Sequence, residues 1–310
     1  MTINSHLSSF YGLKIEEYKP EKSLQNSSNT AYKIAVSWDD SENGVDIEQM
    51  AKSLLEDPGA LDLRALVIGN WEESYENSPQ QLIDLLVANA GKLPNLKAIF
   101  FGDIVMEESE ISWIVQGNYQ AFFKAFPDLE HFQVRGSNGL ELGLAKQLHL
   151  KTLIVECGGL PTSIIQNIAK AELPELTHLE LWLGSDNYGY DAEREDIENL
   201  INTPFPKLNY LGLRDSEQAD LVAEIIAKAP ILKQISSLDL SLGNISDKGA
   251  KALIESPFIA LLEKLDLHHH YISDSMQAKI KELGINVDLS DEQEEDGDDD
   301  EVYRYIAVSE

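Results

Sequence analysis

Residues 238–253 read LDLSLGNISDKGAKAL, and residues 265–274 read LDLHHHYISD. Both belong to a pattern with apolar residues at the first, fourth and sixth positions. The copies of this pattern begin at Leu63, Leu96, Leu129, Leu150, Leu176, Leu208, Ile235 and Leu262, in steps of 21 to 33 residues. A repeat of this length is typical of a solenoid, in which successive structural units stack side by side.

Within each copy the fourth and sixth positions, such as Leu179 and Leu181, face the same side of a strand because they lie two residues apart. Parallel strands need crossover connections, which are usually helical. Leu82, Leu85 and Leu86 have the spacing of such a helix. The sequence therefore predicts the α/β class, as a solenoid with a curved parallel sheet inside and helices outside.

The Ile-Ser-Asp element at 245–247, followed by Gly-Ala-Lys-Ala-Leu at 249–253, resembles the ribonuclease-inhibitor-like class of leucine-rich-repeat proteins. This resemblance covers roughly residues 61–290 and implies a full helix after each strand. The layout also resembles an uncharacterised bacterial cytoplasmic leucine-rich-repeat family, through Phe10-Tyr-Gly-Leu13, Ala65-Leu-Val-Ile-Gly69, Val287-Asp-Leu-Ser290 and Tyr303-Arg-Tyr-Ile-Ala-Val308. Neither resemblance implies an activity, because one repeat fold binds many unrelated partners.

The pattern divides the chain into five segments. Residues 1–30 are expected to form an N-terminal arm and linker, and residues 31–60 a strand-plus-helix cap on the first repeat. About eight leucine-rich repeats then fill residues 61–290. Residues 291–301, of which nine are acidic, are expected to be a disordered spacer before a strand-like segment at 302–310.

Two of these segments have alternative interpretations. The arm could lie across Val67 and Phe100, or a partner could occupy that place, since parallel strands are usually covered on both faces. We expect residues 302–310 to return and pair beside Val287–Leu289, which would cap an open sheet edge. The alternative is a docking motif that a partner captures as an added strand.

The net charge is −30 and the isoelectric point is near 4.4. Such a charge repels phosphate backbones and anionic lipid surfaces, which argues against nucleic acid and membranes as partners. It favours a basic protein partner through faster encounter, although acidity can also serve solubility alone. The start of the chain lacks a secretory signal pattern, and one cysteine, Cys157, fits a reducing compartment. We therefore expect a cytoplasmic protein.

The third, fifth and seventh positions of the copies should form rows on the concave inner face. Trp, Tyr and Arg, which are enriched at binding hot spots, gather in the middle of these rows. The alternative is that these side chains satisfy one another, with Arg135 pairing with Glu156 and Arg214 stacking over Trp182. The predicted partner-binding residues are Arg135, Glu156, His178, Glu180, Trp182, Tyr210, Arg214, Asp239, Asp266 and His268.

The three histidines at 268–270 support a second hypothesis, a metal-binding protein or enzyme, because imidazole suits zinc and Asp266 and Asp239 should lie nearby. Adjacent histidines lack a recognised ligand spacing, so we predict no metal site. Cys157 has no base placed beside it by sequence, and no recognised catalytic or phosphate-binding motif occurs. The sequence therefore predicts no catalytic residues and no cofactor.

These patterns favour a non-enzymatic scaffold that binds a basic protein through its concave face. A third hypothesis is a structural subunit that assembles through the ends of the solenoid. The repeat specifies no oligomeric state.

Overall fold

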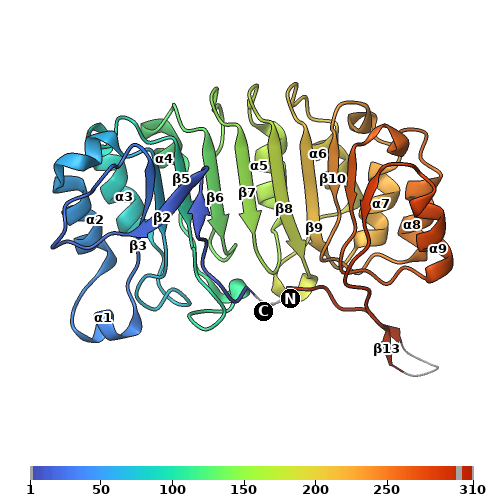
Figure 1. Cartoon of the computed structure of the whole chain (residues 1–310), viewed down its shortest axis with the longest axis horizontal. Coiled ribbons are helices and arrows are strands. Elements are labelled where there is room, and N and C mark those ends of the chain that lie inside the picture. The colour runs from blue at the N-terminus through green and yellow to red at the C-terminus, as the bar shows by residue number, and fades with distance from the viewer. Residues whose placement is uncertain (1–2, 298–301, 309–310) are drawn as a thin grey trace. The chain divides into compact units, whose positions relative to one another are not determined.

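The computed structural model describes residues 3–297 and 302–308. The chain forms two compact units, and Figure 1 shows their helices and strands. The N-terminal unit comprises residues 3–156 and 171–175, and the C-terminal unit comprises residues 157–170 and the described residues from 176 onward. Each unit is of the predicted α/β class, with a mostly parallel sheet and helices in the crossovers.

In the N-terminal unit the strands follow one another in chain order, with β1 antiparallel to β2 and the later neighbours parallel. The strands are β1 (Ser9–Phe10), β2 (Leu13–Glu17), β3 (Thr30–Ile34), β4 (Ala65–Ile68), β5 (Ala98–Phe101), β6 (His131–Arg135) and β7 (Thr152–Glu156). The helices are α1 (Trp38–Glu42), α2 (Ile47–Glu56), α3 (Gln80–Ala88) and α4 (Gln120–Ala125). The cap expected over residues 31–60 corresponds to β3 and α2.

In the C-terminal unit β8 to β12 pair in parallel, again in chain order. The strands are β8 (His178–Gly184), β9 (Tyr210–Ser216), β10 (Ser237–Asp239), β11 (Lys264–Asp266) and β12 (Asn286–Asp288). The helices are α5 (Thr162–Lys170), α6 (Arg194–Ile201), α7 (Ala219–Ile226), α8 (Asp247–Ile254) and α9 (Asp274–Lys281). A separate antiparallel pair joins β13 (Asp296–Gly297) to β14 (Val302–Tyr303).

The apolar positions of the repeat stand in register. Leu179 pairs with Leu211, which pairs with Leu238, and all three side chains are at most 1% exposed. Burial of a leucine side chain stabilises a fold by roughly 1.5–3 kcal/mol, so this column is a major part of the core. The register confirms the prediction that successive copies stack as parallel strands.

In the C-terminal unit, one carboxylate links α7 to the start of α8. Asp220 in α7 accepts hydrogen bonds from the backbone N–H groups of Ser246 (2.8 Å) and Gly249 (2.9 Å). The Ser246 hydroxyl caps α8 by accepting from the Lys248 N–H. A Cβ atom at position 249 would lie 2.6 Å from an Asp220 oxygen, so glycine permits the close approach of the two helices.

The N-terminal arm covers the sheet of its own unit. Phe10 is buried against Val67 and Phe100, with Leu7, Tyr11, Leu13 and Ile15 packed around this cluster. Figure 1 shows the β1–β2 segment in front of the neighbouring strands. Of the two interpretations of this apolar surface, the arm is the one that the structure contains. The segment expected to be an arm and linker contains regular secondary structure, because β2 pairs with β3 as well as with β1.

The expected pairing of the last segment with Val287–Leu289 is wrong for its described part, residues 302–308, because β14 pairs with β13 instead. Arg304 forms an ion pair with Glu295 (2.6 Å), which holds the chain at this hairpin. From there the chain runs to Leu242, whose carbonyl accepts from the Ala307 N–H (2.8 Å).

The acidic spacer expected at 291–301 is described only in part. Residues 291–297 include β13 and contribute contacts through Asp291, Glu292 and Glu295. The expectation for residues 298–301, and that for residues 309–310, lies outside the described residues.

Candidate partner-binding surface

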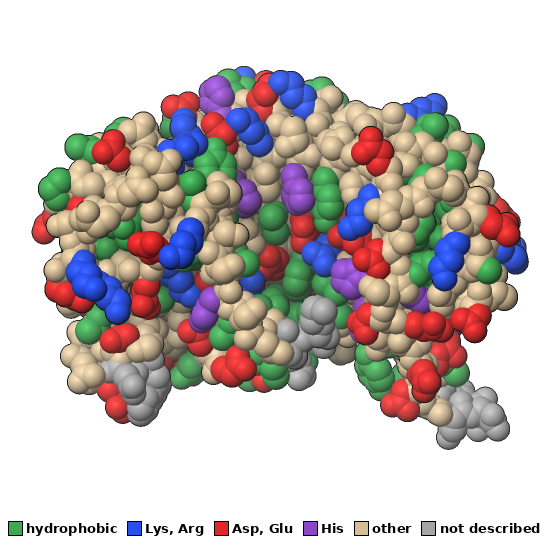
Figure 2. Space-filling view, viewed as in Figure 1, with side chains coloured by type: hydrophobic (Ala, Val, Ile, Leu, Met, Phe, Trp, Pro, Cys, Tyr) green, Lys and Arg blue, Asp and Glu red, His purple; other side chains and the backbone are tan. Residues whose placement is uncertain are grey.

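Alternate residues of β8 to β11 build one polar surface in the C-terminal unit. On β8, His178, Glu180 and Trp182 face this surface, whereas the alternate residues Leu179 and Leu181 face the core and are fully buried. Figure 2 shows acidic, basic and histidine side chains intermingled over the strands of this unit. We call this surface the strand face, defined by His178, Glu180, Trp182, Tyr210, Arg214, Asp239, Asp266 and His268.

Glu180 is the centre of a dense hydrogen-bond network. One carboxylate oxygen accepts from the Trp182 indole N–H (2.9 Å) and from the Arg214 guanidinium (2.7 Å). The other lies 3.3 Å from His178 Nε2. Burial by itself raises the pKa of Glu180, but the His178 hydrogen bond, the Arg214 charge and the Trp182 N–H outweigh burial and lower the pKa to about 2.

Arg214 joins two carboxylates and an aromatic ring. Its Nε lies 3.4 Å from Asp239 and donates to the Ser241 hydroxyl (3.0 Å), and its guanidinium carbon lies 5.3 Å from the Trp182 ring centroid. Burial lowers the pKa of Arg214, but the charges of Glu180 and Asp239 outweigh it and raise the pKa. The side chain is therefore a fixed cation shared by two adjacent acids, whose combined charge it neutralises only in part.

Tyr210 extends this network toward solvent. Its hydroxyl donates to Asp239 (2.7 Å), and its ring stacks on His178 with 3.9 Å between centroids and 2° between planes. Burial and the negative charges of Glu180 and Asp239 raise the pKa of Tyr210, so the hydroxyl keeps its proton and remains a donor. The His178 side chain is 30% exposed, which makes this stacked pair an accessible part of the strand face.

A second cluster lies at β11 and β12. Asp266 interacts with His268 Nδ1 (2.7 Å) and accepts from the Lys264 ammonium (2.8 Å). Burial opposes ionisation of Asp266, but these partners outweigh it and lower the pKa of the carboxyl, while the bond to Asp266 raises the pKa of His268. Asp288 is in register with Asp266, and ligand atoms of Asp266, His268 and Asp288 lie within 4.8 Å of one another.

The three adjacent histidines point to different partners, so they do not form one site. His268 contacts Asp266, whereas His269 Nε2 lies 3.2 Å from the Tyr305 carbonyl. His270 is fully buried and its ring contacts the Leu289 carbonyl and the Ile272 N–H. Burial lowers the pKa of His270. The left-handed backbone of His269 (φ 60°) breaks the alternation that would align the rings.

Arg135 and Glu156 belong to the N-terminal unit and form a separate ion pair there (2.7 Å). Arg135 also donates to the Ile104 carbonyl (2.6 Å) and lies over the Phe100 ring, and Gln133 donates to Glu156 (2.7 Å). Both charged residues are at most 7% exposed. The eight other predicted residues lie in the C-terminal unit, so the predicted list spans two separate networks.

Three residues of the strand-face networks were not predicted. Ser241 and Lys264 occupy row positions of the repeat but lack the hot-spot residue types. Asp288 is the last residue of β12, a strand that does not lie in a complete copy of the sequence pattern. The sequence does contain a pattern that indicates Asp288. An aspartate between two aliphatic residues occurs at Asp239, Asp266 and Asp288, and these three residues are in register in the sheet.

Cys157 is fully buried, and its thiol donates to the Trp182 carbonyl (3.3 Å). This environment is typical of a structural cysteine in a protein interior.

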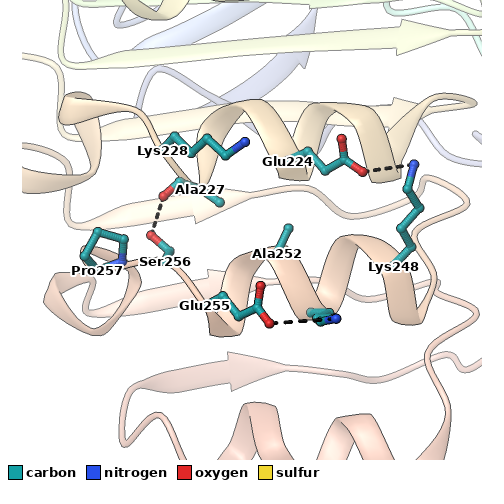
Figure 3. Close-up of a pocket in the computed structure, with 9 residues that line it drawn as sticks. Glu224, Ala227, Lys228, Lys248, Ala252, Glu255, Ser256 and Pro257 are labelled. Atoms are coloured by element: carbon teal, nitrogen blue, oxygen red, sulfur yellow. Dashed lines mark hydrogen bonds and ion pairs between the residues drawn. The ribbon is translucent and has the colours of Figure 1, made fainter.

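A groove between α7 and α8 is lined by both charge signs (Figure 3). Its residues include Lys248, which pairs with Glu224 (2.9 Å), and Lys251, which lies 3.9 Å from Glu255. The carboxylates offset the charges of these two lysines, so the groove offers no concentrated charge for a ligand.

The fold defines the class of this protein: an α/β protein of repeated parallel strands and helical crossovers. Among solved structures, the crystal structure of a Bacteroides fragilis protein is similar, with a TM-score of 0.80 and 31% sequence identity. The similarity covers 89% of this chain and 76% of that chain, and this chain belongs to the same family as the B. fragilis protein. No protein-family model and no curated protein matches the sequence. Among the described residues, no helix is long and apolar enough to cross a membrane.

Proposed function

We propose that this chain is a leucine-rich-repeat solenoid of the ribonuclease-inhibitor-like class that acts as a non-enzymatic protein-binding scaffold in the cytoplasm. The contact surface would be the strand face of the C-terminal unit. The observation that carries the proposal is the stacked His178–Tyr210 pair, which stands partly exposed on a network that Glu180 and Arg214 hold in place. Aromatic side chains held rigidly lose little entropy on binding.

The charge of the strand face favours a basic protein. In-register positions on β10, β11 and β12 carry Asp239, Asp266 and Asp288, and Glu180 lies in the same row on β8, separated from Asp239 by Gly212 of β9. Only part of this charge is neutralised by Arg214 and Lys264. Such a row attracts a basic partner, mainly by raising the rate of encounter.

Several of the predicted residues already bind one another, so not every one of them is expected to contribute to the free energy of partner binding. Trp182, Glu180 and Asp239 are at most 8% exposed and already have partners within the chain. We therefore assign direct contact to His178, Tyr210 and the exposed edge of Arg214. Trp182, Glu180 and Asp239 would position them, and Asp266 would position His268. The Arg135–Glu156 pair would stabilise its own unit.

The test is affinity capture from a native cell extract with the immobilised full-length chain at two salt concentrations. A variant carrying His178→Ala and Tyr210→Ala should lose the captured protein, and higher salt should weaken capture by the native chain. The matched control carries His149→Ala and Tyr75→Ala, which remove the same two residue types at exposed positions of the N-terminal unit. Equal capture by native chain and double variant would refute the proposed surface.

A second candidate function is binding of a divalent cation by Asp266, His268 and Asp288, whose ligand atoms already lie close together. Zinc would be held by the imidazole and by carboxylate oxygens at about 2.0–2.2 Å. Titration of the untagged protein with zinc, followed by calorimetry, tests this candidate. Binding that disappears in His268→Ala but persists in His149→Ala would support it, and the absence of heat would exclude it.

A further inference from the structure

Four consecutive strands of the C-terminal unit, β9 to β12, contain or are followed within three residues by a non-glycine residue in the left-handed region. These residues are Asp215 (φ 53°), Leu242 (φ 67°), His269 (φ 60°) and Asp291 (φ 60°), and the C-terminal segment contacts the first three. These three lie at neighbouring strand ends, because the Asp215 N–H donates to the Ser241 carbonyl and the Leu242 N–H to the His268 carbonyl. Side chains rarely adopt this backbone conformation, and strained residues often cluster where a chain or ligand is clamped. We call Asp215, Leu242 and His269 the turn row.

The C-terminal segment crosses the turn row, and each turn-row residue binds a different residue of the segment. Only backbone atoms of the segment take part in these hydrogen bonds. In order they are His269 Nε2 with the Tyr305 carbonyl (3.2 Å), the Ala307 N–H with the Leu242 carbonyl (2.8 Å), and the Val308 N–H with Asp215 Oδ1 (3.0 Å). The Tyr271 hydroxyl adds bonds to both the N–H (2.8 Å) and the carbonyl (3.0 Å) of Tyr305.

The segment also buries a carboxyl group and one aliphatic side chain. Asp215 is 0% exposed and Val308 is 3% exposed, whereas the Tyr305 side chain is 59% exposed. Asp215 Oδ2 has no hydrogen-bond partner among the described residues. Burial raises the pKa of Asp215 well above that of an ordinary carboxyl. A buried, half-satisfied carboxyl is costly, so the bond from Val308 compensates part of a local penalty.

We propose that the turn row is a peptide-binding site and that the chain's own segment Tyr305–Val308 is its resident ligand. The site would accept an extended peptide that presents a carbonyl, then two N–H groups, and a small aliphatic side chain at the last position. Recognition through backbone bonds and one buried side chain is the mode by which extended peptides add to sheet proteins. The site lies at the strand ends and does not depend on the function proposed for the strand face.

Full-length variants that release the segment provide the test. Ala307→Pro removes the N–H that Leu242 accepts, and Val308→Asp places a second carboxylate beside Asp215. A fluorescein-labelled peptide of residues 302–308 should bind both variants. It should bind the native chain at least about tenfold more weakly, because the resident segment competes at an effective concentration on the order of millimolar. Thermal unfolding verifies that both variants are folded.

Peptide controls identify the backbone contacts. Methylation of the Ala307 nitrogen should abolish binding, whereas methylation of the Ile306 nitrogen should not, because the Ile306 N–H makes no bond to the turn row within the described residues. Failure of both variants to bind the peptide, or equal binding by the native chain, would overturn the proposal.

Hydrogen exchange on the native chain is a second measurement that needs no variant. The Ala307 and Val308 amides should exchange at least about tenfold more slowly than the Ile306 amide, and equal rates would also overturn it.

Discussion

The two units differ in how the sheet face that points away from the helices is protected from water. In the N-terminal unit, Val67 and Phe100 face the arm and are covered by Phe10, so apolar side chains are removed from water within the chain. In the C-terminal unit the strand face has no such cover among the described residues, and it carries Glu180, Arg214 and Asp239 in an ion-paired network. One surface is closed by apolar packing, while the other is kept polar and partly accessible.

The contrast between the two surfaces indicates where a partner can bind. An apolar parallel sheet needs cover on both faces, and a covering segment excludes partners from it. A network of paired charges and stacked rings can remain beside water without that cover, because its polar atoms already have partners. The comparison therefore directs the search for a partner to the C-terminal unit.

The largest effect should follow from breaking the charge network. Arg214→Ala leaves Glu180 and Asp239 buried without their cation, and we expect a loss of about 4 kcal/mol in the free energy of unfolding. Urea denaturation of native and variant chains measures it. A loss below about 1 kcal/mol would mean that water replaces the guanidinium and that the network is not dry.

A smaller loss should follow from opening the covered sheet. Phe10→Ala removes the ring that packs on Phe100 at 6.2 Å between centroids and should cost about 3 kcal/mol. It should also increase binding of a hydrophobic dye. Leu261→Ala, at a position 60% exposed in the C-terminal unit, is the control and should change neither quantity. An unchanged dye signal in Phe10→Ala would contradict the covering role of the arm.

Acid should weaken the charged network but not the apolar one. The pKa of Glu180 is about 2 in the folded chain, below the ordinary value of about 4.3, so its ionised form contributes stability that is present above about pH 4.3. That contribution, on the order of 3 kcal/mol, is lost as the pH falls from there toward about 2. Unfolding free energies of native and Glu180→Gln chains across this range should converge at low pH. A constant difference would contradict the depressed pKa.

The smallest effect concerns the exposed stack. His178→Ala removes the ring that lies on Tyr210 and should cost about 1 kcal/mol of stability, because aromatic pairs contribute modestly beyond their buried area. The same substitution should reduce partner capture far more than it reduces stability. A variant that loses stability but keeps full capture would make the stack structural only.

The repeat of leucines predicted the core because its period fixes which side chains meet. The register of Leu179, Leu211 and Leu238 follows directly from that spacing. The same rows predicted, as one alternative, that Arg214 stacks over Trp182 and that Arg135 pairs with Glu156, since register sets the neighbours.

Other contacts could not be read from the period. The Tyr210–Asp239 bond and the His178–Tyr210 stack depend on rotamers. The divergence of the histidines depends on one left-handed residue, His269. The path of the C-terminal segment joins positions such as Val308 and Asp215, which are far apart in the sequence and share no pattern.

Hydroxyl-radical footprinting of the full-length chain, alone and with the protein recovered by affinity capture, would show whether a partner binds the strand face. Partner binding should reduce oxidation of Tyr210 and His178 and leave that of Tyr75, on the N-terminal unit, unchanged. Protection of Tyr75 with unchanged oxidation of Tyr210 would contradict the assignment of binding to the strand face of the C-terminal unit.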